Sequence, residues 1–248
     1  MKLTATLGKP PQHLFLWYLG LSLYLPPVGA EWHGKVRLLS DYVYRGYSKS
    51  QGDPVGQGQF DYQNQSGWFA GLGVSPVALS SRYYKGTAEF EARPYTGWRL
   101  PVATDWQVAV AATGYIYDGT VFAQTADYAE YSAALHYQDS ISAKISMAPN
   151  AYQRHATTVN YELDYHRDIA DTVQVSAGLA YAQMGQLLGQ DYFYWNAGLS
   201  WFVTSSLSLD LRYVDTQLGG NYWANYHYGW FQPSPMANQY LLSMSLGF

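Results

Sequence analysis

The sequence predicts an all-β fold, a transmembrane antiparallel up-and-down β-barrel of about 12 strands. Segments in which apolar and polar residues alternate recur at short intervals through most of the 248-residue chain. Many of them hold about 10 residues, the length that a tilted strand needs to cross a bilayer, whereas strands of globular sheets average about 5–6. Aromatic residues make up 17% of the chain and charged residues only 13%, about half the usual charged share. Such a surface does not mainly face water.

Composition also excludes several classes of protein. The formal net charge of -4 leaves no basic stripe, which argues against nucleic acid as a partner. The absence of cysteine removes disulfide frameworks, cysteine-based zinc sites and a lipidated cysteine. Mean hydropathy is -0.23, and beyond the N-terminus no apolar run approaches the ~20 residues of a membrane helix. We therefore expect contact with lipid through strands, and no cofactor.

Residues 1–30 have the layout of a secretory signal peptide. Lys2 and Lys9 precede an apolar stretch, "LFLWYLGLSLYL", which is too short to span a membrane as an anchor. The following "PPVGA" places Val28 and Ala30 at the small-residue positions of a cleavage site. This well-formed boundary disfavours the alternative, an uncleaved N-terminal helix. Cleavage after Ala30 would leave residues 31–248 as the barrel domain.

The strands follow in order along this domain. In "VNYELDYH", for example, Val159, Tyr161 and Leu163 share one face, and Glu162 and Asp164 share the other. The connections "QDS" and "TSS" are short, whereas residues 216–238 form a long one, an asymmetry typical of outer-membrane barrels. The twelve predicted strands cover residues 34–47, 55–64, 67–77, 86–99, 104–117, 126–138, 140–149, 157–168, 172–183, 191–203, 206–216 and 239–248.

The charged residues of the strands collect on the face opposite the apolar one. A charge facing lipid costs about 2–4 kcal/mol at mid-membrane, so this face should line the lumen. These charges could pair and hold the barrel shut, or line a narrow aqueous path, which a small acidic excess would bias toward cations. The predicted pore-lining residues are Arg37, Asp41, Arg45, Asp61, Glu89, Glu91, Arg93, Arg99, Glu130, Lys144, Glu162, Asp164, Asp210 and Arg212.

Two smaller patterns have competing interpretations. Asp41 and Arg45 share a parity in one predicted strand, and charge pairing that fixes strand register is favoured there over recognition of a solute. Glu162, Asp164 and His166 also share a face and could suggest a metal or an acid/base group. Alternation alone produces such clusters in a polar lumen, and no second histidine has matching spacing, so no metal site is predicted.

The final strand ends without a polar tail. Its large residues share one parity with the last residue, and Leu241 alone departs from the pattern. Because backbone groups in lipid must all be paired, this strand should seal the barrel against the first one. Such an ending resembles the C-terminal signal that the assembly machinery of bacterial outer-membrane proteins reads. The predicted assembly signal comprises Tyr240, Leu242, Met244, Leu246 and Phe248.

The stretch "SDYVYRGYSKSQGDP" from Ser40, with "FDYQNQSGWFAGLGVS", "YAEYSAALHY" and "SAKISMAPN", resembles the proteobacterial TorF family of porins. Members of that family begin with a similar S-D-Y-x-x-R-G-x-S-x-S strand. The resemblance extends over the whole mature chain, although only this first strand is distinctive. It implies an outer-membrane barrel more than any particular solute.

These observations favour a porin-like channel in a bacterial outer membrane, through which small hydrophilic solutes or ions diffuse passively. An occluded structural or partner-binding barrel is the alternative, and the aromatic loop 219–235 is its best feature. That loop could also fold inward or lie among lipid headgroups, where tyrosine and tryptophan are enriched. An enzyme acting on lipid or peptide is disfavoured, since no G-x-S-x-G motif is present. Oligomeric state stays open.

Overall fold

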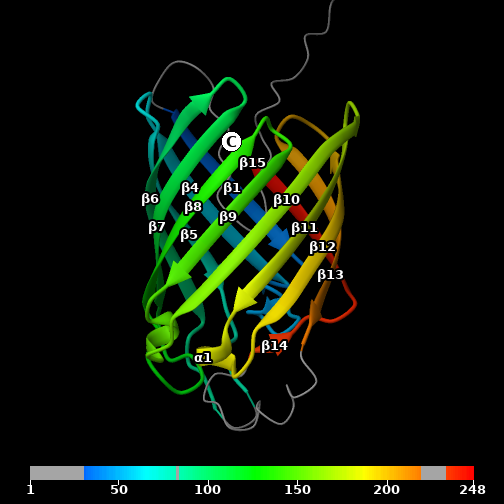
Figure 1. Ribbon diagram of the computed structural model, residues 1–248. Coiled ribbons are helices and arrows are strands. Elements are labelled where there is room, and N and C mark those ends of the chain that lie inside the picture. Colours follow the sequence, from blue (N-terminus) through cyan, green and yellow to red (C-terminus); the bar gives the residue numbers. More distant parts are fainter. Residues whose placement is uncertain (1–30, 82–83, 219–232) are drawn as a thin grey trace, which may run out of the picture.

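Twelve antiparallel strands close into a barrel in the computed structural model, which describes residues 31–81, 84–218 and 233–248 (Figure 1). The predicted signal peptide and most of the aromatic loop 219–235 lie outside these residues. No helix of the described part is long and apolar enough to cross a membrane. The barrel strands are β1 (Glu31–Leu39), β4 (Val55–Gln63), β5 (Trp68–Pro76), β6 (Phe90–Ala103), β7 (Trp106–Tyr117), β8 (Tyr128–Tyr137), β9 (Ile141–Ala148), β10 (Thr158–Ala170), β11 (Val173–Gln183), β12 (Tyr192–Phe202), β13 (Leu207–Gln217) and β15 (Gln239–Gly247).

Neighbouring strands along the chain pair with one another, and β15 closes the ring by pairing with β1. Apolar side chains alternate outward, as the sequence predicts: Tyr161 and Leu163 are 43% and 51% exposed, whereas Glu162 between them is 5% exposed. The all-β barrel of twelve strands is thus confirmed. Its interior is polar and its outer surface apolar, the arrangement of a barrel surrounded by lipid.

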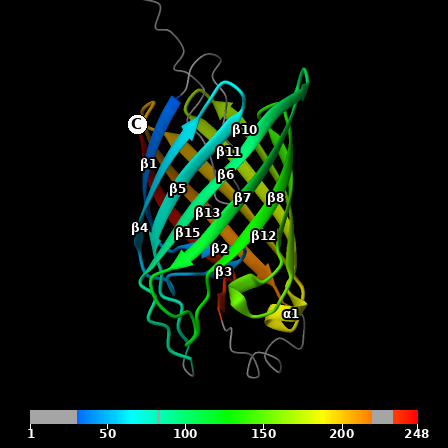
Figure 2. The same cartoon turned by 90° about the vertical axis from the view of Figure 1, so that its left-hand side faces the viewer.

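The two ends of the barrel differ. At the upper end in Figures 1 and 2, β1 begins, β15 ends, and consecutive strands are joined by short turns, such as residues 104–105 and 171–172. At the lower end the connections are longer and hold two short helices, η1 (Ala151–Gln153) and α1 (Gly185–Leu188). We call the lower end the long-loop end.

Two predicted strand boundaries are wrong. The strand predicted over 34–47 is β1 and ends at Leu39, and the strand predicted over 86–99 is β6, which begins at Phe90 and runs to Ala103. The late start of β6 has a local cause, because the Asp118 carboxylate accepts hydrogen bonds from the backbone N–H groups of Glu89 and Phe90. The early end of β1 has a larger consequence for the lumen.

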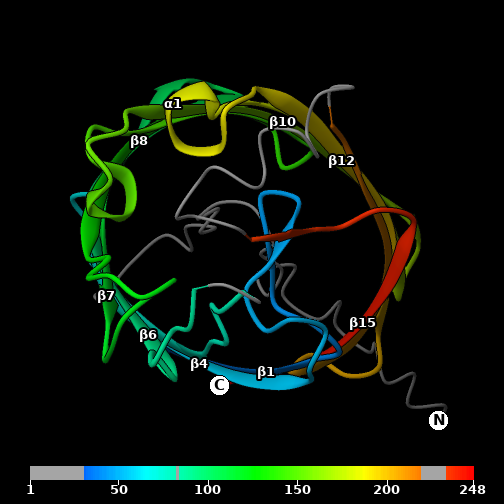
Figure 3. The same ribbon diagram turned by 90° about the horizontal axis from the view of Figure 1, so that it is seen from below.

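After Leu39 the chain turns into the barrel instead of continuing along its wall. β2 (Val43–Tyr44) and β3 (Tyr47–Ser48) form a hairpin, and β14 (Ser234–Pro235) adds a third strand to it. Figure 3 shows this segment inside the ring of strands, seen from the long-loop end. We call residues 40–54 the internal hairpin. The distinctive S-D-Y-x-x-R-G-x-S-x-S stretch, which starts at Ser40, therefore lies wholly in this hairpin and not in the first wall strand.

A small apolar cluster ties the hairpin to the wall. Val43 of β2 packs with Val214 of β13, Met236 and Leu241, and all four are buried. Leu241 was the single departure from alternation in the last strand. Its apolar side chain faces inward because the hairpin covers it there.

The barrel closes between the first strand and the last residue. The N–H of Gly34 donates to the carbonyl of Phe248 (2.8 Å), and the N–H of Phe248 donates back to Gly34 (2.9 Å). The Phe248 ring lies over Gly34 so closely that a Cβ at Gly34 would come within 2.2 Å of it. An aromatic ring that covers a strand glycine shields the hydrogen bonds beneath it and helps to fix register.

We expect deletion of Phe248 to reduce the yield of assembled barrel several-fold, because both hydrogen bonds to Gly34 disappear and the edge is left open in lipid. Gly34→Ala should cause a weaker defect by displacing the ring. Gly56→Ala is the matched control, since its Cβ would meet only Leu38 at 3.6 Å. The measurement is the heat-dependent gel mobility of membrane fractions. Normal assembly of the deletion variant would contradict the role given to Phe248.

Candidate functional site: the internal hairpin and the lumen

Two ion pairs hold the internal hairpin against the barrel wall. The Arg45 guanidinium forms a bidentate salt bridge with the Glu130 carboxylate of β8, with N–O distances of 2.6 and 2.9 Å. The Lys49 ammonium pairs with Glu91 of β6. All four side chains are at most 6% exposed. A charge removed from water in this way is stable only with its partner, so each pair couples the position of the hairpin to one wall strand.

The Lys49 ammonium also lies among tyrosine rings. Its Nζ is 4.3 Å from the centre of the Tyr44 ring and 5.0 Å from that of Tyr115. Tyr115 in turn stacks on Tyr128 with 4.5 Å between ring centres. The negative face of an aromatic ring attracts a cation within about 6 Å. The rings therefore add to the attraction that Glu91 exerts on Lys49.

Hydrogen bonds close the base and the tip of the hairpin. The Asp41 carboxylate accepts from the hydroxyls of Ser48 (2.6 Å) and Ser50 (2.7 Å). At the tip, the carbonyl of Gly46 accepts from the Thr216 hydroxyl and from the N–H of Met236. Gly46 has φ +77 and a Cβ there would lie 2.4 Å from the Thr216 hydroxyl, so this position requires glycine.

Burial sets the protonation of the hairpin tyrosines. Loss of contact with water raises the pKa of the Tyr42 and Tyr44 hydroxyls well above their ordinary value. They remain protonated donors, Tyr42 to Glu91 at 2.8 Å and Tyr44 to Glu130 at 3.4 Å. Desolvation by itself would lower the pKa of Arg45, but the adjacent Glu130 carboxylate reverses this effect and raises it.

The structure corrects the interpretation of Asp41 and Arg45. The two residues do not pair across barrel strands to fix register, because neither belongs to the wall. Asp41 binds hydroxyls of its own hairpin, and Arg45 reaches Glu130, which is 85 residues away in the sequence. The regular alternation continues past Leu39 because the hairpin is also extended. Parity alone therefore does not reveal where the wall ends.

The other predicted pore-lining residues lie in wall strands, with one exception. Lys144 and Glu162 face each other across β9 and β10 at 3.2 Å, and Arg212 contacts Asp210 at 3.2 Å within β13. Arg99 is 1% exposed, and its guanidinium has no hydrogen-bond partner among the described residues. The buried members of the predicted set are Asp41, Arg45, Asp61, Glu91, Arg99, Glu130, Glu162 and Arg212, and the partly buried ones are Arg37, Arg93, Lys144, Asp164 and Asp210.

Glu89 is the exception, since it precedes β6 and is exposed. Two basic residues that the sequence pattern did not single out also face inward: Lys35, which shares the inward parity of β1, and Lys49. Glu31 of β1 and Asp168 of β10 share the inward parity of their strands too, so the interior set holds eight basic and nine acidic residues. The acidic excess is one instead of two, and the lumen is nearly balanced in charge. The "YRGY" turn was the available signal that Lys49 returns on a second strand.

No group of three metal-ligating side chains lies together within the described ranges. Glu162 instead pairs with Lys144 and accepts a hydrogen bond from the Tyr194 hydroxyl at 3.3 Å. His166 lies four residues further along β10, toward the short-turn end. The alternation of β10 explains why these residues share a face.

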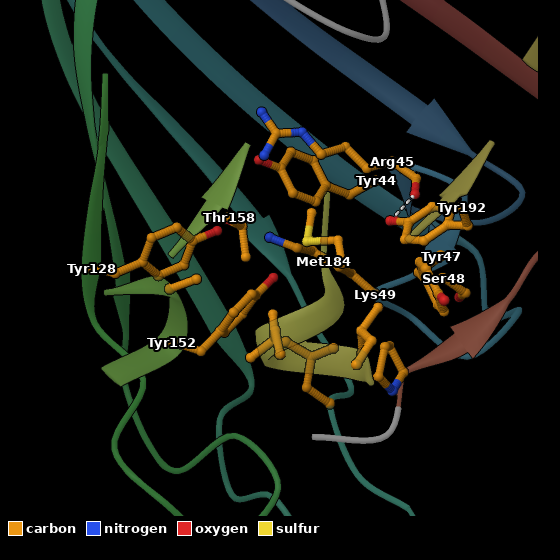
Figure 4. A pocket seen from close by; sticks show the side chains of 15 residues that line it. Tyr44, Arg45, Tyr47, Ser48, Lys49, Tyr128, Tyr152, Thr158, Met184 and Tyr192 are labelled. Atoms are coloured by element: carbon orange, nitrogen blue, oxygen red, sulfur yellow. Dashed lines mark hydrogen bonds between the residues drawn. The ribbon is translucent and has the colours of Figure 1, made fainter. Parts of the chain in front are cut away.

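A cavity opens beside the hairpin at the long-loop end (Figure 4). The space between its lining atoms is about 500 Å³, a figure that includes volume open to solvent. Tyrosine rings from the hairpin and from the starts of β8 and β12 surround it, and α1 contributes apolar side chains. Its polar and aromatic lining comprises Tyr44, Arg45, Tyr47, Ser48, Lys49, Tyr128, Tyr152, Thr158 and Tyr192.

Comparison with solved structures shows the same fold in outer-membrane channels. A KdgM porin covers 87% of this chain and 99% of its own length, with 9% identity and a TM-score of 0.51. The COG4313 outer membrane channel from Pseudomonas putida F1 covers 93% and 98%, with 12% identity and a TM-score of 0.52. A deletion mutant of TodX, a monoaromatic hydrocarbon channel, covers 90% and 89%, with 9% identity and a TM-score of 0.53. At these identities the likeness establishes a porin-like barrel.

No curated protein matches the chain. A family model described as "Bacterial protein of unknown function (Gcw_chp)" matches residues 26–231, which include the internal hairpin and eleven of the twelve wall strands. The chain therefore belongs to the Gcw_chp family of bacterial proteins.

Proposed function

We propose that this protein is a bacterial outer-membrane channel for passive diffusion of small hydrophilic solutes or ions, and that the internal hairpin forms its constriction. The observation that carries the proposal is the closed barrel with an apolar outside and a charged interior. Eight-stranded barrels are filled by side chains and barrels of 16–18 strands hold wide channels, so twelve strands leave room for a narrow path. The porin-like fold of the structural neighbours supports this interpretation.

The same proposal covers how the protein reaches the outer membrane and which class of protein it belongs to. Secretion would depend on cleavage of residues 1–30, and the assembly machinery would read the strand that ends at Phe248. The resemblance to TorF-family porins fits the channel class and stays a proposal. The solved neighbours are channels and not enzymes, which is consistent with a chain that has no catalytic role.

One observation favours a second candidate, an occluded barrel. The hairpin is held inside the lumen by two buried ion pairs, and β14 adds a further strand to it. A hairpin that never leaves this position, together with close side-chain packing around it, would stop conduction. The two candidates differ in a single measurable property, the conductance of the intact protein.

We expect the purified protein to produce steady single-channel steps in a planar bilayer. In a salt gradient the reversal potential should lie near zero, because the interior set holds eight basic and nine acidic residues. A clear cation preference would place the conduction path away from Lys35 and Lys49. Complete absence of steps from protein with folded gel mobility would overturn the channel and favour the occluded barrel.

A further inference from the structure

The cavity beside the hairpin presents an uneven distribution of charge. Among the described residues that line it are two cations, Arg45 and Lys49, and no carboxylate. Their partners Glu130 and Glu91 belong to the wall behind them and do not reach the cavity surface. The Nε of Arg45 is buried without a hydrogen-bond partner. An occupant of this cavity would therefore meet positive charge first.

The rest of the lining is aromatic and apolar. Figure 4 shows the rings of Tyr128 and Tyr152 on one side of the cavity, with Met184 and the Tyr44 ring next to them. Leu187 and Leu188 of α1 add aliphatic surface. In the ligand sites of proteins, a few placed polar groups among apolar and aromatic side chains orient the ligand. The composition of this cavity falls in that class.

We propose that this cavity is a binding site for a small organic anion with an aromatic body, such as an aromatic carboxylate. The carboxylate would lie beside Lys49 and Arg45, and the ring would pack against the tyrosines and the leucines of α1. The inference rests on the proposed channel, because the site lies at the long-loop mouth through which a solute would enter. Binding there would retain an aromatic anion next to the constriction.

The test compares three probes of nearly equal size: benzoate, benzyl alcohol and benzylammonium. Titration calorimetry on the detergent-solubilised protein should give benzoate the tightest binding, about tenfold or more ahead of benzylammonium, a factor equivalent to about 1.4 kcal/mol. In bilayers, benzoate should also lower the open-channel current at concentrations where benzylammonium does not. Equal binding of the three probes, or a preference for the cation, would overturn the proposal.

A paired substitution tests the position of the site. Lys49→Gln with Glu91→Gln removes one cation from the lining together with its wall partner. Arg93, which also contacts Glu91 at 3.4 Å, loses that carboxylate but keeps contact with water, since its side chain is 26% exposed. We expect this variant to bind benzoate about tenfold more weakly and benzyl alcohol unchanged, since one charge-assisted contact is worth about this factor. The control is Asp210→Asn with Arg212→Gln, an ion pair outside the cavity lining.

The experiments can contradict the proposed binding site and the proposed channel independently of each other. If the control variant loses benzoate binding and the Lys49 variant keeps it, the site lies elsewhere and the inference is wrong. If the wild type binds benzoate as expected but never conducts, the proposed channel is wrong and the binding site stands. Gel mobility of unheated samples shows whether each variant is folded.

Discussion

Replacing the internal hairpin with a tight turn should raise the single-channel conductance by roughly threefold or more. The variant would then approach the conductance of larger barrels, whose lumens are open. The fold allows this replacement because Leu39 of β1 and Val55 of β4 face each other in register. An Asn-Gly turn in place of residues 40–54 would connect them as an ordinary β-hairpin. The wall would stay closed while the lumen loses the segment that crosses it.

This deletion should also change selectivity. Without Lys49 and Arg45, the carboxylates of Glu91 and Glu130 remain at the mouth, and an acidic ring attracts cations. We expect the reversal potential to shift toward cation preference. Adding Glu91→Gln and Glu130→Gln to the deletion should remove that shift and leave the larger conductance. An unchanged conductance in a folded deletion variant would mean that the constriction lies elsewhere in the barrel.

Breaking the Arg45 ion pair should have the second-largest effect. In Glu130→Gln the guanidinium is left buried without its carboxylate, which costs about 3–5 kcal/mol in comparable buried pairs. The hairpin can avoid this cost by leaving the wall, while the hydrogen bonds between the strands keep the barrel closed. We expect frequent transitions to a higher-conductance level, together with protease cleavage within residues 40–54 of the folded protein.

Two variants make this prediction specific. Exchange of the charges, Arg45→Glu with Glu130→Arg, should restore the lower conductance without these transitions, since the same pair forms in the opposite orientation. Asp210→Asn breaks the pair with Arg212, which lies within β13 and does not involve the hairpin, so it should leave the hairpin protected. Equal cleavage in Glu130→Gln and the wild type would show that other contacts suffice to hold the hairpin.

The sequence was enough to predict the wall but not what fills it. In β10, Tyr161 and Leu163 face lipid and Glu162 faces the lumen. A strand between these two environments requires a two-residue repeat of apolar and polar side chains, and this repeat is visible in the sequence. The internal hairpin is extended as well, so "YVY" continued the same rhythm while the chain left the wall. The partners of Arg45 and Lys49 are set by closure of the ring, which brings together residues more than 40 positions apart. No local pattern contains that information.

The pairing of β14 with β3 has a consequence for how the protein is made. Ser234 and Pro235 lie opposite Ser48 and Tyr47, so the inner sheet joins segments from the two ends of the barrel domain. Contacts between such distant segments form late, because the entropy of closing the intervening loop must be overcome first. The first part of the domain can therefore place residues 40–54 in the lumen before the third strand arrives. During assembly the inner sheet is completed only when the segment that holds β14 has reached the barrel.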